Sequence, residues 1–143
     1  MKRFLITIRW ALLIEVLNSL LGQLLRPHLG YVPFHAVTIA VLFWSGWLVT
    51  KKQRGSLAHA AWAGPVILVL GFMLVGVLYN LITGDFSEVG QGANVSWVKD
   101  SPRLAYLVAV LGSTILFLPL AALVSVLGGV IGRKVGKPAS TNA

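Results

Sequence analysis

Residues 5–25 read LITIRWALLIEVLNSLLGQLL, and this stretch decides the fold. At a rise of 1.5 Å per residue, about 20 apolar residues cross the hydrocarbon core of a bilayer. Glu15 lies in the middle of the stretch, too far from either end for its short side chain to reach water. An acid at that depth costs at least about 2.5 kcal/mol on insertion scales, so a polar partner, a proton or a cation has to offset it. The stretch therefore predicts a membrane helix that carries a buried acidic group.

The composition of the whole chain agrees with a membrane protein. Of its 143 residues, 57% are hydrophobic and 11% are charged, and the mean hydropathy is +0.83. Soluble domains carry about 25% charged residues, so much of this surface has to face lipid. The absence of cysteine excludes disulfides and cysteine nucleophiles. The net charge of +8 comes from basic residues beside the apolar runs, which favours contact with the lipid bilayer over nucleic acid.

Four apolar runs predict an all-α fold, a bundle of four transmembrane helices. The runs cover residues 5–25, 32–50, 60–83 and 104–131. We expect a single membrane domain over 1–143, with an outer loop at 84–102 and a basic C-terminal tail at 132–143. Pro119 predicts a kink in the fourth helix. Pro65 falls near the start of the third, where a missing N–H costs little.

Basic residues predict how the spans are oriented. Those on the side of both chain ends are Lys2, Arg3, Lys51, Lys52, Arg54, Arg133, Lys134 and Lys137. Those on the opposite side are Arg26, Lys99 and Arg103. Because lysine and arginine concentrate in cytoplasmic segments, we expect a multi-pass protein of a bacterial inner membrane with both termini in the cytoplasm.

The polar face of the first span holds the candidate site. The residues that share this face at helical spacing are Ala11, Glu15, Asn18, Ser19, Gly22 and Arg26. The face should turn toward other helices, because lipid cannot satisfy polar groups. Glu15 and Asn18 are close enough to hydrogen-bond. Two interpretations stay open: a neutral acid bonded to Asn18 or to a neighbouring helix, and a site that binds a proton or a cation.

Small residues predict close helix packing. In the third span, Gly71 and Gly76 permit the approach of a neighbouring backbone, and Asn80 is expected to hydrogen-bond another helix. In the fourth span, two stripes recur every four residues: Gly128, Gly132 and Gly136, and Ala121, Ser125 and Gly129. Such stripes serve contacts within a chain as often as between chains. A homo-oligomer and a larger membrane complex therefore both stay open.

The sequence contains no pattern that predicts an enzyme, a cofactor or a metal site. His28, His35 and His59 are divided between the two sides of the membrane, and no carboxylate lies at ligand spacing from them. No Ser-His-Asp arrangement, phosphate loop or dinucleotide fingerprint is present.

Part of the chain resembles the small multidrug resistance transporters, which are four-helix proteins. The resemblance rests on Ile14-Glu15-Val16 and on the alanine-rich run LAHAAWAG at 57–64. It implies that Glu15 exchanges protons for a cationic substrate and that Trp62 lines the same chamber. Trp62 thus joins Glu15 and Asn18 among the candidate proton- or cation-binding residues. The chain departs from that family at His59, where a tyrosine is typical, and in its longer loop after the third span.

Two functions are compatible with these features. The first is a small, homo-oligomeric carrier or channel for small or cationic solutes, with Glu15 as a protonatable site. The second is a non-catalytic accessory protein, such as an assembly, anchoring or regulatory subunit of a membrane complex. The carrier hypothesis predicts that Glu15→Gln abolishes transport. The accessory hypothesis predicts that substitutions at Gly128 and Gly132 disrupt binding to a larger partner.

Overall fold

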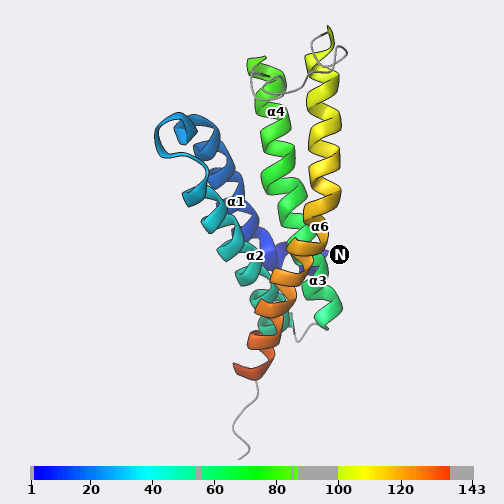
Figure 1. Ribbon diagram of the computed structural model, residues 1–143. Helices are drawn as coiled ribbons and strands as arrows, with labels where there is room; N and C mark the ends of the chain where they lie inside the picture. Colours follow the sequence, from blue (N-terminus) through cyan, green and yellow to red (C-terminus); the bar gives the residue numbers. More distant parts are fainter. Residues whose placement is uncertain (1, 54–55, 85, 87–99, 136–143) are drawn as a thin grey trace, which may run out of the picture.

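The computed structural model describes residues 2–53, 56–84, 86 and 100–135. Its elements are α1 (Lys2–Leu29), α2 (Val32–Gln53), α3 (Leu57–Ile67), the π-helix η1 (Leu68–Met73), α4 (Leu74–Thr83) and α6 (Pro102–Val135) (Figure 1). Because α3, η1 and α4 continue into one another, the elements make four helices long and apolar enough to cross a membrane. This confirms the predicted all-α, four-helix architecture of a small multi-pass membrane protein. Gly136, most of the predicted outer loop and most of the tail lie outside the described residues.

Local caps explain three helix ends. Gly30 and Gly84 have φ values of 69° and 70°, and each donates its N–H to a carbonyl four residues earlier at 2.9 Å. Glycine adopts this left-handed conformation without a Cβ penalty, so it ends α1 and α4. The third span begins at Leu57, before the predicted start at 60. Ser56 caps it there by accepting a hydrogen bond from the N–H of His59.

The sequence suggested that Pro65 falls near the start of the third span. In the structure, Pro65 lies in the interior of α3. It cannot donate a backbone hydrogen bond, and its ring crowds the preceding turn. The π-helical turn η1 begins at Leu68, within one turn of this proline. Local π turns are one way in which membrane helices pair backbone groups freed by proline. This turn carries Gly71 and Phe72, which contact α1.

The second half of α6 packs closely against α2 and α3, whereas its first half stands beside α4 (Figure 1). A Cβ added at Gly46 of α2 would strike the carbonyl oxygen of Ser125, and one at Gly64 of α3 would strike that of Ala121. Figure 1 also shows the α1–α2 pair leaning away from α4 and the first half of α6. The second half of α6 is therefore tightly joined to α2 and α3 at one end of the bundle, and the spans diverge toward the other end.

Both small-residue stripes of α6 are used inside the chain. Gly128 lies against the carbonyl oxygen of Phe43, and Gly132 lies against Trp47 and Thr50. The second stripe likewise contacts α2 and α3. These contacts assign Gly128 and Gly132 to intramolecular packing, one of the two uses that the spacing left open.

Candidate functional site

Glu15 is completely buried where α1, α2 and η1 meet. Thr38 of α2 lies close to it, and its hydroxyl donates a hydrogen bond of 2.6 Å to Oε1 of Glu15. The other carboxyl oxygen, Oε2, is buried without a hydrogen-bond partner, the only such side-chain atom in the part of the chain that the structure describes. An unsatisfied buried acceptor costs about 1–3 kcal/mol, and more if it is charged. One half of the carboxyl group is thus held in place, and the other half has no hydrogen-bond partner.

Asn18 completes a small network with Thr38. Its Nδ2 donates to the hydroxyl of Thr38 at 3.2 Å and to the carbonyl oxygen of Phe34 at 3.1 Å. The hydroxyl of Thr38 is also 3.1 Å from that carbonyl oxygen. Asn18 therefore ties α1 to α2 one helical turn beyond Glu15, and the predicted proximity of the two residues on one face is observed.

The network can serve both protonation states of Glu15. A hydroxyl has one hydrogen to donate and two lone pairs that accept. When Glu15 is ionised, Thr38 donates to Oε1. When Glu15 carries a proton on Oε1, the acid donates to Thr38, and Thr38 turns its hydrogen toward the carbonyl oxygen of Phe34. Asn18 donates to Thr38 in both cases, so no heavy atom has to move.

The opposite wall of the site is the π-helix η1. A Cβ added at Gly71 would lie 2.8 Å from Cγ and 2.9 Å from Cβ of Glu15, so only glycine allows this approach. Ser19 donates a hydrogen bond of 3.3 Å to the carbonyl oxygen of Phe72 and joins α1 to η1 directly beside the acid. Gly71 was predicted to allow close packing. That its neighbour is Glu15 was not predicted, because the pairing depends on how the helices cross.

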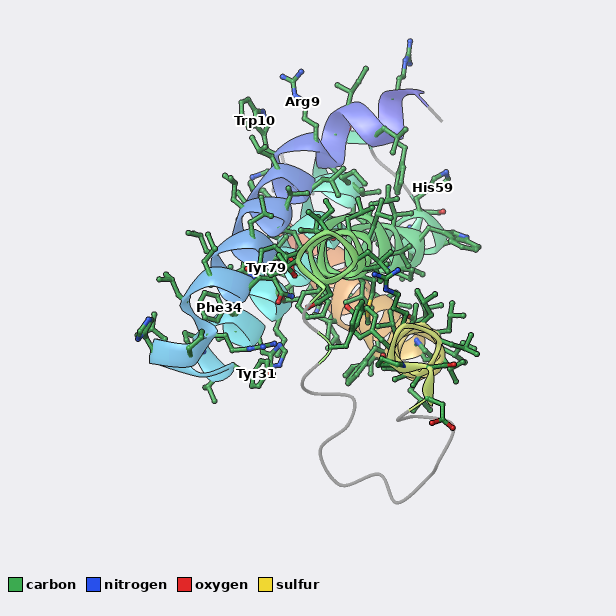
Figure 2. The ribbon with its side chains drawn as sticks, turned by 90° about the horizontal axis from the view of Figure 1, so that it is seen from above. Arg9, Trp10, Tyr31, Phe34, His59 and Tyr79 are labelled. Atoms are coloured by element: carbon green, nitrogen blue, oxygen red, sulfur yellow. The ribbon has the colours of Figure 1, made fainter. Side chains whose placement is uncertain are left out.

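Arg9 is not the counter-ion of Glu15. Figure 2 shows Arg9 and Trp10 pointing away from the bundle, and the guanidinium lies over the Trp10 ring, 5.4 Å from its centroid. Around Glu15 lie instead the neutral side chain of Thr38 from α2, the backbone of Gly71 from η1 and Asn18 of its own helix.

Two cavities flank the network. The larger, of about 300 Å³, is bounded by α2, η1 and α6, and its polar lining residues are Thr38 and His35. The smaller, of about 70 Å³, lies between α1, α2 and η1, and Asn18 and Ser19 form part of its wall. Thr38 thus faces the larger cavity and Asn18 faces the smaller one.

Trp62 is not brought to this site. Its side chain is 68% exposed and lines a separate apolar hollow with Pro65 and Leu118. The resemblance to the transporter family implied that Trp62 shares a chamber with Glu15, but here it occupies the outer surface of α3. Of the three candidate residues, the structure groups Glu15 and Asn18 and adds Thr38. The sequence held no signal for Thr38, which is one of three hydroxyl residues within an apolar span.

The remaining packing candidates lie apart from the acid. Gly76 of α4 faces Gln23 of α1, with a Cβ position 3.4 Å from Nε2. Asn80 donates a 2.8 Å hydrogen bond to the hydroxyl of Tyr106 and so links α4 to the first half of α6. This is the hydrogen bond to another helix that the sequence predicted for Asn80.

Comparison with known protein families, curated proteins and solved structures gives no match. The function is therefore argued from the site itself. Among the described residues, no three histidine or acidic side chains lie together in a group that could hold a metal ion. The groups at hand are one carboxyl, one hydroxyl and one amide. Together they can hold and release a proton or bind a small cation.

Proposed function

We propose that the protein is a small carrier or channel for small or cationic solutes, alone or as a homo-oligomer, in which Glu15 takes up and releases a proton. The observation that carries this proposal is the asymmetry of the carboxyl group. Oε1 is held by Thr38, whereas Oε2 is buried without a partner. An acid with a purely structural role is stabilised by pairing both oxygens. A free oxygen beside a network that serves both protonation states fits a group that changes state.

The larger cavity supports a transport role. Its volume of about 300 Å³ is at the lower end of the range for small-molecule sites. Thr38 both lines this cavity and hydrogen-bonds Glu15, so a solute held there is separated from the acid by one side chain. Its walls are otherwise mostly apolar, which suits the organic part of a small solute.

The test is transport by Glu15→Gln in proteoliposomes. Tetraphenylphosphonium, a lipophilic cation, serves as the solute probe, and a pH-sensitive dye inside the vesicles reports proton movement. We expect Glu15→Gln to insert normally and to lose solute-driven proton movement, because glutamine cannot ionise. Thr38→Ser, which keeps the hydroxyl, is the matched control and should retain movement. A fully active glutamine variant would rule out the proposed role of Glu15.

We also propose that the protein lies in a bacterial inner membrane with both termini in the cytoplasm. The support is the excess of basic residues on the side of the chain ends. A reporter that works only in the cytoplasm should be active when fused after residue 143. A reporter that works only outside the cytoplasm should be active when fused within the segment 87–99. The reverse pattern would invert the topology.

The accessory role has weaker support. It was tied to Gly128 and Gly132 as a surface for a larger partner, and both glycines pack against α2 in this chain. A partner at that stripe would have to displace α2. The carrier function is therefore the one that the site favours.

A further inference from the structure

The smaller cavity lies beside Glu15, toward the turn between α1 and α2. Residues from one face of α1 form a wall of it: Asn18, Ser19, Gly22, Gln23 and Arg26. A buried water needs roughly 10–15 Å³ of such space and two to four polar partners. The cavity has about 70 Å³, which is room for a short chain of waters, and its largely apolar wall is interrupted by the polar side chains of α1, which can serve as their partners.

The end of this cavity nearest the turn is formed by Arg26, Tyr31 and His35. The Arg26 guanidinium lies 5.4 Å from the centroid of the Tyr31 ring, and Tyr31 stacks on His35 at 5.9 Å. Figure 2 shows Tyr31 and Phe34 together at the turn end of the α1–α2 pair. Tyr31 is exposed, and an arginine at a helix end extends its charged group toward water. The cavity therefore runs from the aqueous boundary inward.

Asn18 separates the cavity from the acid. It lines the cavity, and its amide is fastened to the carbonyl oxygen of Phe34 and to the hydroxyl of Thr38. Glu15 is one helical turn deeper and does not line the cavity. Asn18 is thus the member of Glu15's hydrogen-bond network that borders this cavity.

The other side of Glu15 is closed by hydrocarbon. Ile8 and Ala11, on the same helix, are completely buried and belong to a cluster with Val49, Ala63 and Ile67. An apolar cluster packed in this way offers water no hydrogen-bond partners, so it stays dry. The acid thus has a polar approach on one side and an apolar barrier on the other.

We infer that Glu15 exchanges its proton with one membrane face only, the face of the α1–α2 turn, through the hydrated small cavity, and that Asn18 is the gate of this path. The inference rests on the proposed role of Glu15 as a proton-binding group. It adds the membrane face from which the proton reaches Glu15, and it separates the path of the proton from the path of the solute. The small cavity is too narrow for an organic solute. Solute is therefore assigned to the larger cavity beyond Thr38.

The titratable and charged groups around this path are few. Arg26, His35 and Tyr31 lie at the mouth of the cavity. The residues that face Glu15 from α2 and η1, Thr38 and Gly71, carry no titratable group. The proton on Glu15 is consequently governed by Asn18 and Thr38, not by a neighbouring charge.

The native chain has no cysteine, so single cysteines test the path directly. Ser19→Cys places a thiol on the cavity wall, Ala11→Cys places one in the apolar cluster, and Val32→Cys marks the exposed turn face. Oriented vesicles are treated with Ag⁺ from one side at a time. Protected thiols are then counted by maleimide labelling after denaturation. Gln23→Cys, on the same wall, replaces Ser19→Cys if that variant does not insert.

We expect Ser19→Cys to react from the turn face at least about tenfold faster than Ala11→Cys, a difference of about 1.4 kcal/mol. Ala11→Cys should react from neither face. Equal rates for the two positions, or faster reaction of either from the opposite face, would overturn the inference. Filling the cavity with Gly22→Leu, whose Cβ would press on the Phe34 ring at 3.3 Å, should slow Ser19→Cys. An unchanged rate would also count against the path.

The gate has its own test. Glu15→Cys should be unreactive when Asn18 is present and should react from the turn face when combined with Asn18→Ala. Equal reactivity in both backgrounds would remove Asn18 as the gate. The two proposals also fail separately. Active transport by Glu15→Gln with the expected labelling defeats only the proposed function. Inactive Glu15→Gln with an unreactive Ser19→Cys defeats only the access path.

Discussion

Gly71 of the π-helix lies directly against the aliphatic part of Glu15, where an added Cβ would come within 2.8 Å of Cγ. The one membrane-embedded acid is thus packed on the one π-helical segment among the described elements. π turns are rare within α-helices and frequently occur at functional sites. Here the turn carries a glycine, which has no side chain to fill the contact, and its Phe72 carbonyl accepts a hydrogen bond from Ser19 on the same helix as the acid.

Gly71→Ala should destabilise the protein by about 1–3 kcal/mol, because the new methyl group overlaps Cβ and Cγ of Glu15, which are too near the backbone to move freely. Gly112→Ala is the matched control. Its Cβ would meet nothing within 4 Å, and alanine favours a helix over glycine. Thermal unfolding in detergent, followed by circular dichroism, should show a lower midpoint for Gly71→Ala alone. Equal midpoints would mean that η1 does not press on Glu15.

Thr38→Val should destabilise the protein in a way that depends on Glu15. Valine keeps the shape of threonine but removes the hydroxyl that donates to Oε1, which leaves a buried carboxyl without a partner. In a Glu15→Leu background the same substitution should cost much less. We expect a coupling energy of about 0.5–3 kcal/mol from the four unfolding free energies. Additive effects would show that the two side chains do not interact.

Gly128→Ala should impair folding of the single chain and not only its association. The added Cβ would strike the carbonyl oxygen of Phe43, so α6 would have to move away from α2. The yield of monodisperse protein after extraction should fall well below that of Gly112→Ala. If Gly128→Ala folded normally and lost only an oligomer, this stripe would belong to an interface between chains.

Tyr106→Phe should loosen the first half of α6 from α4. It removes the hydroxyl that accepts a hydrogen bond from Asn80 at 2.8 Å and keeps the ring that packs against Phe86 at 5.5 Å. Hydrogen bonds between membrane helices contribute about 0.6 kcal/mol on average. Hydrogen exchange should therefore accelerate in the residues after Pro102, while α3 is unchanged. Tyr79→Phe, which removes a hydroxyl from the residue of α4 next to Asn80, should leave that exchange rate as it is.

Sequence reasoning located the spans because length and hydropathy suffice for that purpose. A run such as 5–25 has to be helical in lipid, where each backbone polar group needs an internal partner. Helical periodicity also placed Glu15 and Asn18 on one face of α1. The start of α3 was missed, although a serine directly before an apolar helical run, as Ser56 is before Leu57, is a recognisable cap.

What the sequence alone determined is the number of helices, their membrane character and the face of α1 that turns inward. Only the tertiary structure decided that Thr38 and Gly71 meet Glu15, that Trp62 does not, and that Gly128 packs on its own chain. The physical reason is that periodicity relates residues along a single helix. Contacts between helices depend on their crossing, which here is decided by close backbone approaches and by one π turn.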